Sequence, residues 1–117
     1  MAEVTILRTA GTSEVHQVGR HILLDWCRRM IGAELIDTVN LRDGRVMIVD
    51  DAGYDVQVTT REGEWEGRPT TFETHTPIRA RKPLNTAATA LYHGVCRPGA
   101  THQIVGDVAI VWDRDFA

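Results

Sequence analysis

The sequence contains few of the residues that usually reveal a compartment or a redox function. Among its 117 residues there are two cysteines, four prolines and only 6% aromatic residues. Cys27 and Cys96 lie far apart and form no CxxC motif. No secretory signal is visible at the N-terminus, so we expect a cytoplasmic protein whose two thiols are reduced.

Long apolar runs and phosphate-binding loops are missing as well. No stretch approaches the ~20 apolar residues that a membrane span requires, so no membrane association is expected. Neither GxGxxG nor GxxxxGKS/T occurs, and residues 63–67 (GEWEG) carry acids where a phosphate would be repelled. These absences disfavour ATP-driven work and Rossmann-type redox chemistry, and no cofactor is expected.

Lysine is almost absent, because the positive charge comes from twelve arginines and a single lysine, Lys82. The 16 acidic residues leave a formal net charge of −3. This balance disfavours general nucleic-acid binding, since such proteins need a basic face to displace counterions from phosphate. Domains usually span ~100–200 residues, so we expect residues 1–117 to form one domain.

Apolar periodicity predicts the first elements. β-branched and apolar residues predict strands over 2–8 and 14–18, joined by a turn. Over residues 20–31 apolar side chains recur at spacings of three and four, which predicts an amphipathic helix that ends at Gly32. The members of this stripe are Ile22, Leu23, Trp26, Cys27, Met30 and Ile31.

The middle of the chain changes from clear patterning to a polar segment. Alternation over 33–41 and 46–49, around an Asp-Gly pair, predicts a hairpin, and residues 54–58 predict a further short strand. Residues 59–82 are rich in arginine, threonine and glutamate and have few apolar anchors. We expect either a functional or mobile loop, or a long hairpin with strands near 64–68 and 70–76.

A second helix and a central strand are predicted near the C-terminus. The helix spans residues 83–95, with Pro83 in its first turn or Asn85 as its N-cap. Residues 103–112 form the most apolar run, which predicts a central strand with a bulge or a close backbone approach at Gly106. The inner face of the helix is predicted to contain Leu84, Ala87, Ala88, Leu91 and Val95.

These elements predict an α+β fold. We expect a mostly antiparallel sheet of five or six strands, with two helices packed on one face, and a polar tail over residues 113–117. A small sheet with exposed edges is easily extended by a second copy, so a homodimer is expected.

Three segments together resemble a family of small uncharacterised phage and mobile-element proteins, known as a domain of unknown function. The segments are IGAELIDTVNLRDGRVMIVDDAGY, PLNTAATALY and HQIVGDVAIV. The resemblance covers roughly residues 20–60 and 83–112, and the segment 59–81 departs from it. It implies a phage setting, hence a host cytoplasm, and supplies no catalytic residues. The matching positions are Asp50, Asp51, Gly53, Asn85, Ala88, Gly106 and Asp107.

The best ligand candidates cluster around the second helix. Polar side chains crowd its start, where unpaired backbone amides can hold an anion. Hydroxyl, imidazole and amide groups follow before the central strand, and arginines at the rim can neutralise phosphate. Tyr54 and Trp65 are further aromatic candidates for stacking on a base. The candidate set is Asn85, Thr86, Thr89, Tyr92, Arg97, Thr101, His102, Gln103, Arg79 and Arg81. The alternative is that these residues act as a helix cap, helix surface and solvated linker.

Metal and nucleophilic sites have weaker support. His93, Cys96 and His102 are clustered in the sequence and could bind zinc, with Asp107 as a fourth ligand. The alternative is that His93 lies at the end of a helix and that the Cys96 thiol is buried as a small apolar group. Cys96 with His102 and Asp107 has the inventory of a hydrolase without a family signature. We therefore predict no metal and favour a protein that is not an enzyme.

Three functions follow from these observations. The first is a small phage-type binding protein that acts on a host factor or sequesters an anionic, nucleotide-like ligand to counter host defence. The second is a protein–protein inhibitor or adaptor that acts through residues 59–82. The third is a Cys/His or metal-dependent hydrolase.

Overall fold

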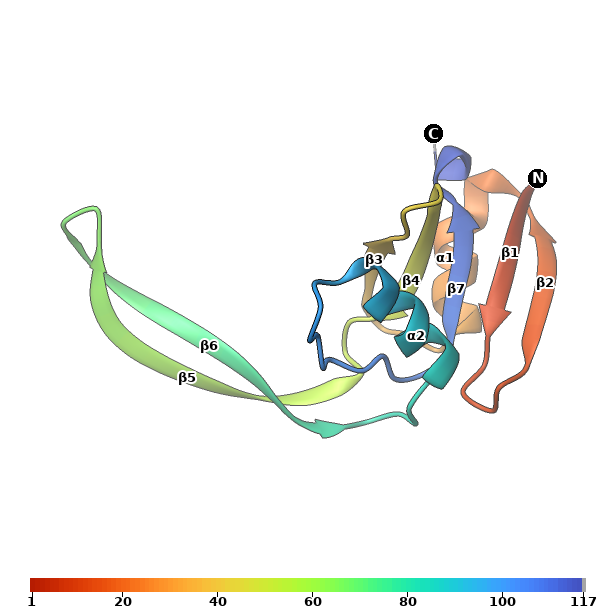
Figure 1. Ribbon diagram of the computed structural model, residues 1–117. Helices are drawn as coiled ribbons and strands as arrows, with labels where there is room; N and C mark the ends of the chain where they lie inside the picture. Colours follow the sequence, from red (N-terminus) through yellow and green to blue (C-terminus); the bar gives the residue numbers. More distant parts are fainter. Residues whose placement is uncertain (117) are drawn as a thin grey trace.

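The computed structural model describes residues 1–116, and its main body is a five-stranded antiparallel sheet in the order β2-β1-β7-β4-β3 (Figure 1). The chain forms two hairpins, β1–β2 and β3–β4, and the late strand β7 pairs with both β1 and β4. The α+β class and the antiparallel sheet predicted from the sequence are confirmed. The strands are β1 Ala2–Leu7, β2 Ser13–Val18, β3 Ile36–Asn40, β4 Arg45–Asp50 and β7 Val108–Trp112.

The two helices lie on opposite faces of this sheet, so the prediction that both pack on one face is wrong. α1 (Leu23–Met30), preceded by the 3-10 turn η1 (Arg20–Ile22), packs on one face. α2 (Thr86–Val95) packs on the other. Successive residues of β4 and β7 alternate between these two cores. The physical reason is that both central strands are apolar on both faces, so each face needs its own cover.

Each helix follows its predicted stripe only in part. Five of the six predicted residues of α1 belong to its core, while Ile22 stays 46% exposed. On α2, Ala88, Leu91 and Val95 face the sheet, but Leu84 and Ala87 are exposed. Tyr92 packs against this core instead.

Two boundaries near the C-terminus differ from the predicted ones. The strand predicted over 103–112 begins only at Val108, because Ile104 and Val105 lie in a buried loop tied to α2. Gly106 ends this loop with a φ of +78°, a conformation that favours glycine. The predicted polar tail contains the 3-10 turn η2 (Asp113–Phe116), whose buried Asp115 pairs with Arg20 at 3.0 Å. Ala117, the last residue of that tail, lies outside the described residues.

The polar middle segment forms a long hairpin, called the arm here, that projects from the body (Figure 1). It consists of β5 (Tyr54–Trp65) and β6 (Arg68–Ala80). The long hairpin given as one alternative is confirmed, and the strand predicted near 70–76 lies within β6. The strand predicted near 64–68 is wrong, because the turn falls at Glu66 and Gly67. Both turn residues have positive φ, 51° and 76°, as a type I′ hairpin turn requires.

The arm makes the molecule elongated. The radius of gyration is 16.6 Å, whereas a compact chain of this length has about 13 Å. The longest dimension, 51 Å, exceeds the other two by about 20 Å. Within residues 1–116, no helix is long and apolar enough to cross a membrane.

Candidate functional site

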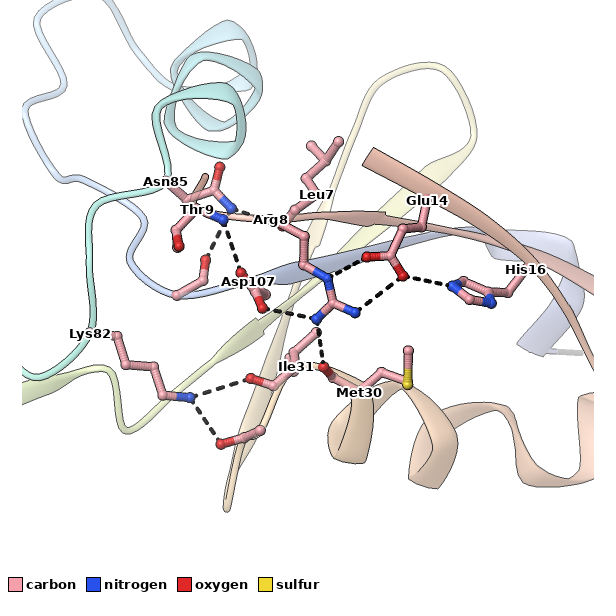
Figure 2. Close-up of polar contacts among 12 residues, drawn as sticks. Leu7, Arg8, Thr9, Glu14, His16, Met30, Ile31, Lys82, Asn85 and Asp107 are labelled. Carbon is pink, nitrogen blue, oxygen red and sulfur yellow. Dashed lines mark hydrogen bonds and ion pairs between the residues drawn. The ribbon is translucent and has the colours of Figure 1, made fainter. Parts of the chain in front are cut away.

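Two of the positions quoted for the family resemblance, Asn85 and Asp107, hold distant segments of the chain together through hydrogen bonds (Figure 2). Asn85 is 1% exposed and caps α2 by accepting a hydrogen bond from the Ala88 amide at 3.0 Å. Its side-chain NH₂ donates to the carbonyls of Leu7 and Gly106, both at 3.0 Å. Asn85 is therefore a structural residue, and the prediction that it binds a ligand is corrected.

Asp107 and Lys82 also link segments that lie far apart in the chain. Asp107 accepts hydrogen bonds from the Thr9 amide and from the Arg8 guanidinium, both at 2.9 Å. Lys82 pairs with the buried carboxylate of Asp50 and donates to the Gly32 carbonyl at 2.9 Å, just beyond the end of α1. A side chain at Gly106 would come within 2.8 Å of Lys82, so glycine is needed there for space as well as for its φ.

Arg8 is the centre of a charged cluster on the same end (Figure 2). Its guanidinium pairs with Glu14 at 2.7 Å, and Glu14 also contacts His16 at 3.0 Å. The Arg8 hydrogen bond, with a smaller effect of His16, lowers the pKa of Glu14 from its ordinary value to about 2. Since these groups are paired with one another, the cluster acts as a structural tie rather than a ligand site.

A cavity of about 230 Å³, called the junction cavity here, opens where the arm joins the body. It lies between the arm base, the β3–β4 hairpin and the loop after α2. Three members of the candidate set line it, namely Tyr92, His102 and Gln103, and so does the further aromatic candidate Tyr54. The other lining residues are Asp37, Val39, Val49, Asp50, Asp51, Val56, Pro77, Ile104 and Val105.

Three rings line the cavity wall near α2. The His102 ring lies 5.5 Å from Tyr54 and 5.8 Å from Tyr92, measured between ring centroids. The Tyr54 hydroxyl donates to the Gln103 carbonyl at 2.7 Å, and His93 contacts the His102 carbonyl at 2.6 Å. The loop that carries His102 is therefore held at a fixed distance from both the arm and α2.

The charged residues that line the cavity are aspartates. Asp37 and Asp51 are exposed, whereas Asp50 is neutralised by Lys82. From the sequence, Asp50 and Asp51 were named only as positions of the family resemblance and Asp37 was not singled out, since a lone aspartate in a strand carries no signal. The cavity therefore favours positively charged groups.

The remaining candidate residues lie away from this cavity. Thr89 is engaged with the body, because its hydroxyl accepts a hydrogen bond from the Ile104 amide at 2.9 Å. Arg81 pairs with Asp55 at 2.9 Å and thereby secures the base of the arm. Thr86, Arg79, Arg97 and Thr101 are exposed and do not line the cavity.

The metal and hydrolase alternatives find no assembled site in the described part of the chain. Residues 1–116 contain no group of three or more His, Cys, Asp or Glu side chains arranged to hold a metal ion. Asp107, the third member of the hydrolase inventory, is bound to Arg8 and Thr9 instead. Cys27 is buried, which raises its pKa to about 11 and makes a reactive thiolate unfavourable.

The two faces of the arm carry opposite charges. Directly paired residues of β5 and β6 share a face, so the pairing register assigns every side chain from 56 to 77 except the turn. The acidic face consists of Val56, Val58, Thr60, Glu62 and Glu64 on β5 and Pro69, Thr71, Glu73, His75 and Pro77 on β6. The basic face consists of Gln57, Thr59, Arg61, Gly63 and Trp65 on β5 and Arg68, Thr70, Phe72, Thr74 and Thr76 on β6.

Side-chain contacts agree with this assignment. The Arg61 guanidinium lies 4.9 Å from the Phe72 ring centroid, and a side chain at Gly63 would meet the same ring at 3.0 Å. On the other face, His75 contacts Glu73 at 3.4 Å. Both faces are open to solvent, and of the residues assigned to them only Gly63, Thr70 and Phe72 are half-buried.

No family model, no curated protein and no solved structure matches this chain. The arm and the junction cavity are therefore the features from which we infer a function.

Proposed function

We propose that this chain is a non-enzymatic binding protein and that the arm is the element that contacts its macromolecular partner. The observation that carries the proposal is a 27-residue hairpin that projects from the body with both faces in solvent. An isolated two-stranded hairpin is only marginally stable in water, so a long one without a cover is typical of an element that binds something.

Exposed apolar side chains on the arm support this role. Val58, Trp65 and Ile78 are exposed by 49%, 64% and 63%. The outer edge of β5 contains no proline, while β6 contains Pro69 and Pro77, which cannot donate to a neighbouring strand. An extended partner segment therefore finds a complete set of backbone donors only along β5.

Sequestration of an anionic nucleotide-like ligand has less support than binding of a macromolecular partner by the arm. The junction cavity, at about 230 Å³, is smaller than the ~300–1,000 Å³ of typical small-molecule pockets. Its aspartates would also repel phosphate. We also propose that the partner is a host protein, on the ground that three segments of the chain resemble small phage proteins.

A shortened arm tests the proposal. Replacing residues 58–75 by Asn-Gly closes the hairpin on the Gln57–Thr76 pair and keeps the cavity lining intact. We expect a protein that the wild type retains from a lysate of the native host to be lost with this variant. The free energy of unfolding of the body should change by less than about 1 kcal/mol, because the deleted segment contributes nothing to either core.

Cross-linking gives the matched control. A photo-reactive residue at Thr60 on the arm should form an adduct with that protein, and one at Thr38, exposed on β3, should not. Retention of the same protein by the shortened arm, or no retention by the wild type, would contradict the proposal.

A further inference from the structure

We infer that the junction cavity receives a lysine or arginine side chain from a positively charged partner segment that lies along the acidic face of the arm. This inference rests on the proposed function, because it names the chemistry of the partner that the arm would bind.

Charge segregation on the arm is the first step. Glu62, Glu64 and Glu73 all fall on the acidic face, whereas Arg61 and Arg68 fall on the basic face. On the acidic face, among the described residues, His75 is the one side chain that can become positive, and it lies beside Glu73. A segment along this face would therefore meet carboxylates from the tip of the arm to its middle.

The acidic face continues into the junction cavity. Val56 and Pro77 are the innermost pair of that face, and both also line the cavity. The surface therefore passes from glutamates, across an apolar step, to the aspartates Asp37 and Asp51. Such continuity means that one extended segment can contact both regions at once.

The cavity has the chemistry of a site for a cationic side chain. Positive groups are attracted to the faces of tyrosine rings, and Tyr54 and Tyr92 line the same cavity as the aspartates. Two exposed carboxylates remain to neutralise the guest, since Lys82 already neutralises Asp50. The small volume suits one long side chain rather than a whole ligand of drug size.

A second copy of the chain fits this surface less well. In a two-fold dimer the same face meets itself, which would bring Glu62, Glu64 and Glu73 against the same residues of the partner. Acidic against basic face would be complementary, but it is a head-to-tail contact that does not close into a dimer. A positively charged segment of another protein complements the negative charge of both the acidic face and the junction cavity.

The test uses two labelled synthetic peptides, one alternating lysine with valine and one alternating glutamate with valine. Binding to the full chain is followed by fluorescence anisotropy near physiological salt, where the screening length is about 8 Å. We expect the lysine peptide to bind at least ten-fold more tightly than the glutamate peptide. The triple variant Glu62→Gln, Glu64→Gln, Glu73→Gln should weaken its binding about ten-fold, and Asp37→Asn with Asp51→Asn about five-fold.

Two controls separate the site from net charge. The triple variant Glu3→Gln, Glu34→Gln, Asp113→Asn removes three exposed carboxylates from the body and should change the affinity less than two-fold. The pair Arg61→Gln and Arg68→Gln alters the opposite face and should not weaken binding. Circular dichroism confirms that each variant keeps its sheet.

The outcomes distinguish this inference from the proposed function. Tighter binding of the glutamate peptide, no binding of either peptide, or equal weakening by the body and arm variants would overturn the inference. The proposed function would still stand if the shortened arm loses the native partner. If the shortened arm retains that partner while the lysine peptide follows the expected pattern, the proposed function fails and the charged face binds peptides independently of it.

Discussion

The body and the arm use the same strand alternation for different purposes. In β4 and β7 of the body, successive side chains face the α1 core and the α2 core in turn, and both sides are apolar. In β5 and β6 of the arm, successive side chains face solvent on both sides and separate carboxylates from arginines. The alternation of side chains along a strand thus determines which residues share a face of the sheet. Whether that face is buried depends on whether a helix or another element covers it.

The two regions also differ in how they are held. The body is tied by buried polar groups such as Asn85, which links β1, α2 and the segment before β7. The arm is secured mainly at its base, where Arg81 pairs with Asp55 and the Arg81 amide donates to the Gly53 carbonyl at 2.8 Å. A change in the body should therefore lower global stability, and a change at the base should reorient the arm.

The largest expected effect comes from removing the Asn85 side chain, whose hydrogen bonds link distant segments of the body. Asn85→Ala removes the cap of α2 and leaves the carbonyls of Leu7 and Gly106 without their donor. We expect a loss of about 3 kcal/mol in the free energy of unfolding, measured by urea denaturation. Thr86→Ala, at the exposed neighbouring position, is the control and should change stability by less than about 0.5 kcal/mol. Equal losses in both variants would mean that the tie does not hold the body.

An intermediate effect is expected at the junction between the two regions. A side chain at Gly53 would come within 2.7 Å of the Val105 side chain, which is buried. Gly53→Ala should therefore lower the free energy of unfolding by about 1–3 kcal/mol. Adding Val105→Ala should recover at least about 0.5 kcal/mol relative to the sum of the single changes. Simple additivity would show that the contact does not set the position of the arm.

The smallest effect concerns surface charge on the body, and it depends on pH. Because the folded-state pKa of Glu14 is lowered to about 2, its stabilising effect is complete above its ordinary pKa near 4.5 and is lost as the pH falls toward 2. The difference in urea midpoint between wild type and Glu14→Gln should be constant above pH 5 and should shrink between pH 4.5 and 2. Glu62→Gln on the arm, which removes a carboxylate without an ion pair among the described residues, should show no such trend. A constant difference for Glu14→Gln down to pH 2 would contradict the assignment.

The sequence predicted most of the body and little of the site. Apolar period and turn residues located β1 to β4, α1 and the Asn85 cap of α2, because these features depend on neighbours in the chain. The site residues were chosen by type around α2, and of these Tyr92, His102 and Gln103 line the cavity. The other lining residues come from β3, β4 and the arm. These elements approach the loop after α2 through long-range contacts, which no pattern of neighbouring residues in the sequence indicates.

The sequence by itself determined most strands of the body and both of its helices, since these follow from spacing along the chain. The order of charges along the arm is also in the sequence, but the pairing of β5 with β6 assigned those charges to two faces. Only the tertiary structure decided that the helices cover opposite faces, because that choice follows from two central strands being apolar on both sides. The tertiary structure likewise decided that Asn85 and Asp107 hold the body together instead of binding a ligand, since their partners lie 21 to 99 residues away in the chain. The tertiary structure also decided that both faces of the arm are open to solvent, because nothing in the described part of the body covers them.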